Sequence, residues 1–240
     1  MNRFTSEELY VLASLMGREF IIGVEGKTLE DNMSDLKGML MKNYSDLEAR
    51  GLLEYRIDGT LLVDPEIRKI VKILNKADSV FVVSTDMHGA REKVNYLRYG
   101  NEYCKLIDKG TSYSAAVVDE FDSNSLLGLY GIQLSGEPLK KYSVPISFLT
   151  ELSDMYNSFN GSEADAMLTE IINEPETEKM MHECLSHKNN SFVMKEYKRS
   201  GKHMVNVGNY ILRYINDFVL SFSICDGDTV IMSIYRKELN

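Results

Sequence analysis

Apolar and polar positions alternate with the period of amphipathic helices in the N-terminal part of the chain. Thr5 followed by Glu8 has the form of a capping box, which predicts the start of a helix. Apolar residues then recur at spacings of three and four as far as Gly17. A second helical pattern over residues 36–47 ends before Gly51, because glycine is typical of the position after a helix. The sequence therefore predicts two helices here.

A hairpin and a run of strands are predicted next. Residues 52–57 and 61–63 flank Asp58-Gly59, a dipeptide that favours a type I′ turn. Two helices followed by a hairpin are typical of a winged-helix segment. After a further helix, the pattern predicts antiparallel strands at residues 79–84, 92–98, 102–108 and 112–119.

This order of a helix followed by strands occurs twice. One helix begins with Asp64-Pro65-Glu66 and the other with Glu174-Pro175-Glu176, so the two prolines lie 110 residues apart. We therefore predict one domain over residues 1–240, with pseudo-repeats 1–120 and 121–240. The predicted fold class is α+β, a quasi-twofold duplicated fold whose central antiparallel sheet is flanked by helical bundles. The second half should contain helices near 126–127, 146–156, 164–172 and 176–187, and strands at 191–197, 203–207, 210–216, 218–224 and 229–236.

Charge is distributed unevenly along the chain. The net charge is −9. Between Lys141 and Lys179 the sequence contains no lysine or arginine but eight acidic residues. Such a segment repels the phosphate backbone of nucleic acids, so we expect no nucleic-acid partner there.

Hydropathy and cysteine content indicate the compartment. The longest uncharged runs, such as residues 142–150, are too short to cross a bilayer, and the N-terminus does not resemble a signal peptide. Three cysteines without a C-x-x-C motif fit buried thiols in a reducing compartment. We therefore expect a cytoplasmic protein without a membrane span.

Sequence motifs for catalysis or cofactor binding are weak. His182 and His187 are five residues apart on a predicted helix, which places them on different faces. Asp226-Gly227-Asp228 is explained by a hairpin turn, and Gly26-Lys27-Thr28 lacks the remaining residues of a phosphate-binding loop. We expect no enzyme activity, no cofactor and no metal site.

Methionine is unusually frequent, with 13 residues. Met167, Met180 and Met181 fall on predicted helices, where the thioethers either fill a core, which is the favoured reading, or form an adaptable contact surface. Met87 and His88 fall in a predicted turn between strands, where an apolar side chain has little core to enter. These two residues are candidates for contact with a partner.

DNA binding is the alternative that the winged-helix pattern raises. The second predicted helix and the residues around it balance lysine and arginine against aspartate and glutamate. A recognition helix with balanced charge binds DNA weakly. A winged-helix regulatory protein is kept only as the second hypothesis.

Four sequence features resemble a known family. They are a helix opening with Ser6-Glu7-Glu8-Leu9, the segment Leu47–Leu53 that ends another helix, the Asp58-Gly59 turn, and Val63-Asp64-Pro65. Together they resemble the EspG family, the cytosolic chaperones of ESX, or type VII, secretion. The resemblance covers residues 5–119, and the second half agrees in its order of a helix followed by strands.

The resemblance implies a function in protein binding. EspG chaperones bind the helical tip of a secreted heterodimer and keep it soluble for export. They use the central sheet, a loop between its early strands and the C-terminal helices. Carried over by position, this implies partner contacts at Ser84, Asp86, Met87, His88, Arg91, Met167, Met180 and Met181.

Composition modifies the expected client. The chain has no tryptophan, four prolines and many lysine, isoleucine, tyrosine and asparagine residues, which suggests a low-GC Gram-positive bacterium. We therefore expect LXG toxins with WXG100-like helical partners as clients, in preference to PE/PPE pairs. The sequence leaves the oligomeric state open.

Overall fold

The computed structural model of the chain describes most of its residues, and these form two compact units. Unit 1 comprises Met1–Val82, Lys93–Phe121 and Tyr197–Val205; unit 2 comprises Val83–Glu92, Asp122–Glu196 and Asn206–Asn240. The described residues are 1–17, 21–24, 36–87, 90–121, 137–158, 161–186, 190–201, 203–215, 218–226 and 228–236.

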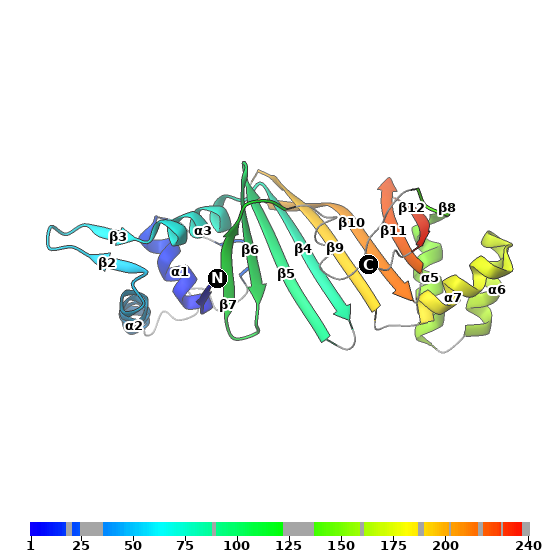
Figure 1. Cartoon of the computed structure of the whole chain (residues 1–240), viewed down its shortest axis with the longest axis horizontal. Coiled ribbons are helices and arrows are strands. Elements are labelled where there is room, and N and C mark those ends of the chain that lie inside the picture. The colour runs from blue at the N-terminus through cyan, green and yellow to red at the C-terminus, as the bar shows by residue number, and fades with distance from the viewer. Residues whose placement is uncertain are drawn as a thin grey trace. The chain divides into compact units, whose positions relative to one another are not determined.

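Helices and strands alternate in blocks along the chain (Figure 1). Strands β4, β5, β9 and β10 contribute residues to both units. The elements are β1 (Asn2–Phe4), α1 (Ser6–Leu15), α2 (Leu36–Ala49), β2 (Leu53–Tyr55), β3 (Leu61–Val63), α3 (Pro65–Lys76), β4 (Ser79–Met87), β5 (Ala90–Tyr99), β6 (Glu102–Asp108), β7 (Tyr113–Val118), β8 (Lys140–Pro145), α5 (Ile146–Asn157), α6 (Gly161–Ile172), α7 (Pro175–Ser186), β9 (Asn190–Ser200), β10 (His203–Ile215), β11 (Phe218–Asp226) and β12 (Thr229–Arg236).

A large sheet connects most of the strands. Its order is β1-β7-β6-β5-β4-β9-β10-β11-β12-β8, and β2 and β3 form a separate hairpin. The pairs β5–β6, β6–β7, β10–β11 and β11–β12 are antiparallel. The predicted combination of helices with a large antiparallel sheet is confirmed.

Helix α3 shows how the sequence builds the core of unit 1. Oδ1 of Asp64 accepts hydrogen bonds from the backbone N–H groups of Glu66 and Ile67, and Pro65 occupies the first turn, where it has no N–H to satisfy. One face of the helix then buries Ile67, Ile70, Val71, Ile73 and Leu74. This stripe packs with α1 and the β5–β7 strands in one apolar cluster, in agreement with the predicted amphipathic helix.

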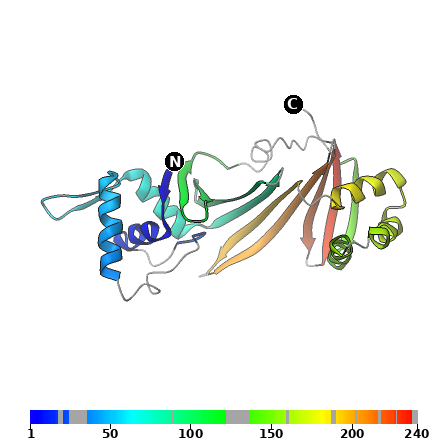
Figure 2. The same cartoon turned by 90° about the horizontal axis from the view of Figure 1, so that it is seen from below.

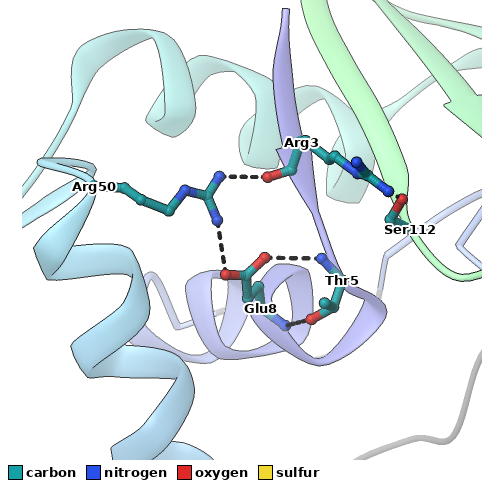
Figure 3. Close-up of polar contacts among 5 residues, drawn as sticks. All are labelled: Arg3, Thr5, Glu8, Arg50 and Ser112. Carbon is teal, nitrogen blue, oxygen red and sulfur yellow. Dashed lines mark hydrogen bonds and ion pairs between the residues drawn. The ribbon is translucent and has the colours of Figure 1, made fainter.

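The capping box of α1 is also confirmed (Figure 3). The backbone N–H of Glu8 donates to Oγ1 of Thr5, and Oε2 of Glu8 accepts from the backbone N–H of Thr5. Arg50, just beyond α2, donates to Oε1 of the same glutamate and to the carbonyl oxygen of Arg3 in β1. Arg3 in turn donates to Oγ of Ser112. The ion pair of Glu8 and Arg50 thus joins α1, the end of α2 and β1.

The core of unit 2 lies between helices α5–α7 and the strands β8, β11 and β12. In Figure 2 these green to yellow helices lie beside the orange and red strands. Phe222 of β11 pairs with Met232 of β12, and Val230 pairs with Val144 of β8. Because alternate residues of a strand share a face, this register directs a continuous apolar surface at the helices.

Three strands differ from the predicted elements. Residues 203–207 and 210–216 were expected as two strands, but β10 is one strand, in which the side-chain amides of Asn206 and Asn209 hydrogen-bond to each other. Strand β8 was not predicted, because only Tyr142 and Val144 point inward, a pattern too short to identify a strand without its partner. Strand β1, paired with β7, was not predicted. The helix expected near residues 126–127 lies outside the described residues.

Candidate partner-binding site

An apolar pocket of about 480 Å³ lies in unit 2 at the border of its helical layer. Helix α5 forms one side, and strands β10, β11 and β12 form the other. Such a volume falls within the usual range for binding pockets, about 300–1,000 Å³. The lining residues are Ile146, Leu149, Thr150, Leu152, Asp154, Tyr156, Leu185, Asn209, Ile211, Arg213, Phe222, Ile224 and Val230.

Helix α5 is fixed at its start by the sheet. The backbone N–H of Ile146 donates to the carbonyl oxygen of Asp228, next to β12, at 2.8 Å. From there Leu149, Leu152 and Tyr156 follow at helical spacing, and Leu152 is fully buried in the core of unit 2. The helix therefore presents a largely apolar side to the pocket while its inner face is held in the core.

Alternation along β10 and β11 supplies the opposite wall. Asn209, Ile211 and Arg213 are two residues apart on β10, so they share one face. Ile211 pairs with Phe222 of β11, which also lines the pocket. Ile224, two residues further on, is 37% exposed and lies at the accessible part of the wall. The sheet thus offers apolar surface that the helices leave uncovered.

Polar groups at the pocket have local partners. Nη1 of Arg213 donates to the carbonyl oxygen of Leu185 at 3.0 Å, in the last turn of α7. A cation there is favourable, because helix C-termini carry partial negative charge. Asn209 exchanges hydrogen bonds with Asn206 through both side-chain amides, at 3.1 and 3.2 Å. The pocket therefore combines apolar walls with a few placed polar groups.

Tyr156 belongs to the pocket and also to a polar contact between three helices. Its hydroxyl lies 3.2 Å from Oδ1 of Asp165 on α6 and 3.3 Å from Nδ1 of His182 on α7. Nδ1 of His182 lies 2.5 Å from the same Oδ1 of Asp165. Burial, followed by the charge of Asp165, raises the pKa of Tyr156, so the hydroxyl stays protonated and donates.

The walls of the pocket are mostly apolar. Within the described part of the chain, no group of three or more histidine, cysteine, aspartate or glutamate residues could hold a metal ion. The described helices include none that is long and apolar enough to span a bilayer. What the pocket offers is apolar area, which favours the burial of apolar side chains from another molecule.

The predicted methionines lie in the helices around this core. Met167 and Met180 are half-buried and pack against the apolar cluster of unit 2. Met181 is fully buried in that cluster. Core packing accounts for Met181, and its side chain offers no surface to a partner. The three methionines are not among the residues that line the pocket.

The other predicted residues lie on β4 and β5. Ser84 and Asp86 are half-buried in β4, within unit 2. Met87 ends β4 and Arg91 lies in β5, but their side chains, like the whole of His88, lie outside the described residues. A partner site at this turn stays a prediction.

The pocket residues escaped sequence reasoning because they come from separate segments. One available signal was the spacing of Ile146, Leu149, Leu152 and Tyr156, which places four apolar or aromatic side chains near one side of a helix. The face of β10 that meets them follows only from the sheet order, because a strand pattern does not identify its neighbours.

Comparison with known proteins yields a structural likeness. No family model matches the chain, and no curated protein matches it. Among solved structures, the chain is similar to the type VII secretion system chaperone EspG5 of Mycobacterium tuberculosis, whose structure is of a complex with a PE25–PPE41 dimer. The TM-score is 0.67 at 12% sequence identity, covering 96% of this chain and 89% of EspG5. This likeness establishes a shared fold.

Proposed function

We propose that the protein is a cytosolic, ATP-independent chaperone or adaptor for helical substrates of type VII secretion. The observation that carries the proposal is a fold likeness to EspG5 over 96% of the chain, in a molecule with its own apolar pocket. EspG5 was found with a PE25–PPE41 dimer bound. The quasi-twofold duplication and the winged-helix character of the N-terminal segment belong to this proposal.

The pocket of unit 2 is proposed as a client contact. Long amphipathic helices expose apolar side chains at their ends, and these aggregate unless another surface covers them. When an apolar side chain from such a helix end enters the pocket, the free energy falls by about 25 cal/mol for each Å² of apolar surface removed from water. No catalytic step is needed, and the proposal assigns none.

A second contact is proposed at the turn between β4 and β5. It comprises Ser84, Asp86, Met87, His88 and Arg91, the positions that the EspG resemblance implies. Met167 and Met180 are retained as candidates because their half-buried side chains keep some exposed surface, and Met181 is assigned to the core.

The proposed clients are LXG toxins with WXG100-like partners. We prefer them to PE/PPE pairs because the composition of the chain suggests a low-GC Gram-positive bacterium. The export apparatus must release such a client without nucleotide hydrolysis by the chaperone. Moderate affinity is therefore expected, because the tightest class of complexes would not dissociate in time.

The test is reconstitution of the complex. Tagged protein is purified from its native cytosol, co-eluting proteins are identified by mass spectrometry, and the candidate client is produced separately for calorimetric titration. Stoichiometric binding of a secreted helical protein is expected. Recovery of the protein with DNA, together with salt-dependent DNA retardation, would instead support the winged-helix regulator.

A further inference from the structure

One tyrosine is shared between the apolar pocket and a polar cluster outside it. Tyr156 is one of the residues that line the pocket, and its hydroxyl lies beside Asp165 and His182 on the two neighbouring helices. The rings of Tyr156 and His182 are 5.6 Å apart in an edge-on arrangement. A change at Asp165 would therefore reach the pocket through a single side chain.

Close packing alone does not hold this cluster. The side chains of Asp165 and His182 are 49% and 41% exposed. Both also line a second hollow of about 380 Å³, between α6 and α7, with Glu178, Lys179 and Glu183 around them. Because open space lies beside the pair, hydrogen bonds rather than core contacts must fix the outer end of Tyr156.

Asp165 is the member on which these contacts converge. Its Oδ1 accepts from the hydroxyl of Tyr156 and from Nδ1–H of His182. The hydrogen bond from His182 fixes the carboxylate of Asp165, and this carboxylate in turn fixes the hydroxyl of Tyr156. The hydroxyl of Tyr156 donates to Asp165, which is not among the residues that line the pocket.

We propose that Asp165 is a positioning residue for the binding pocket, which acts by anchoring Tyr156 as part of the pocket wall. The inference rests on the proposed function only in taking the pocket as the client site. Without Asp165, the hydroxyl of Tyr156 keeps only Nδ1 of His182 beside it, an imidazole that has lost its own carboxylate partner, so the aromatic ring is held less firmly in the pocket wall. Client selection then depends on a residue that the client does not touch.

The test uses a dye, so that it does not require the client. The probe is 1-anilinonaphthalene-8-sulfonate, whose aromatic rings suit an apolar pocket, titrated into the full-length protein with fluorescence detection. Ile224→Asp should abolish dye binding and so identify the pocket as its site. A wild type without dye binding, or dye binding unaffected by Ile224→Asp, would overturn the inference.

Three variants separate positioning from stability. Asp165→Ala should raise the dye dissociation constant by about fivefold or more. The matched control is Thr169→Val, which removes a hydroxyl that lies 3.1 Å from Oε2 of Glu178 and 2.9 Å from the backbone carbonyl oxygen of Asp165, and keeps the Asp165 carboxylate that accepts from Tyr156. It should leave the constant within about twofold of wild type, even where both variants lower the melting temperature.

The double variant Tyr156→Phe/Asp165→Ala gives the decisive test of the positioning role. Phenylalanine keeps the ring and needs no acceptor, so affinity should return to within about twofold of wild type. Unchanged affinity in Asp165→Ala, equal weakening by Thr169→Val, or no recovery in the double variant would overturn the proposal. If the dye results hold and purified clients fail to bind the wild type, the proposed function fails and the positioning role stands.

Discussion

Nη1 of Arg50 lies 2.8 Å from Oε1 of Glu8, a carboxylate whose side chain is only 8% exposed. The same glutamate closes the capping box of α1, so one ion pair secures a helix start and the end of α2. The ring of Phe4 lies beneath the guanidinium, with 5.5 Å from its centroid to Cζ. This cluster joins the N-terminal segment of unit 1 to the end of α2.

Removal of Arg50 should therefore destabilise the protein. We expect Arg50→Ala to lower the free energy of unfolding by about 1–3 kcal/mol, because it leaves a nearly buried carboxylate with fewer partners. Urea denaturation followed by circular dichroism measures the change. The matched control is Arg56→Ala, whose exposed contact with Glu54 spans 4.0 Å and should matter by less than about 0.5 kcal/mol. Equal effects of both variants would contradict the role of this pair.

Stability at acidic pH should depend on Asp78. Burial acts to raise the pKa of Asp78, but hydrogen bonds from the backbone N–H of Gly100 and from Arg98 outweigh it and lower the pKa below 3.8. A lowered folded-state pKa adds stability above the unfolded value, and this contribution is lost as the pH falls through the folded-state value.

The Asp78→Asn variant tests this linkage. Its urea midpoint should be lower than that of the wild type at pH 7, and the difference should shrink as the pH falls below the usual aspartate range and the wild-type carboxyl becomes protonated. Midpoints measured at several pH values provide the comparison. A difference that stays constant over this range would show that the charge of Asp78 contributes nothing.

The thiol of Cys104 should be inert in the folded protein. Burial raises its pKa to about 12. At pH 8 about one thiol in ten thousand would be ionised, and the thiolate is the reactive form. In a Cys184→Ser/Cys225→Ser background, iodoacetamide should modify Cys104 only after unfolding in urea, as measured by intact mass. Rapid alkylation without denaturant would contradict the buried position.

The sequence predicts a client contact at the turn between β4 and β5. Replacing Met87 and His88 with charged residues should abolish client binding without unfolding the protein. Binding is measured by calorimetry with the purified client, and folding by circular dichroism. A folded variant that binds the client as the wild type does would remove this turn from the contact surface.

Local patterns predicted most elements of the fold. The capping box at Thr5 and Glu8 and the proline-led helix α3 are written in neighbouring residues, so their positions could be read directly. Strand β8 could not, because it is defined by pairing with β12, far away in sequence, where Val144 lies opposite Val230. The position of an edge strand depends on long-range pairing of this kind, so the local sequence carries little signal for it.

The candidate site was less accessible to sequence reasoning for the same reason. Met181 is conspicuous as one of two adjacent methionines, yet it faces the core, and helical spacing alone could not tell its inner face from an outer one. Ile211 and Leu149 line one pocket because β10 lies beside β11 in the sheet and α5 packs near them. The EspG-like sequence motifs cover residues 5–119, whereas the structural likeness to EspG5 extends over 96% of the chain at 12% sequence identity.

The most direct test of the central claim is client binding by wild type and two matched isoleucine variants. Ile224→Asp places a charge in the pocket wall, and Ile57→Asp places one at the fully exposed position in the β2–β3 turn of unit 1. The client identified by co-purification is titrated calorimetrically into each folded protein. The account predicts that Ile224→Asp weakens binding by about tenfold or more, while Ile57→Asp binds as the wild type does. Equal binding by all three proteins would contradict it.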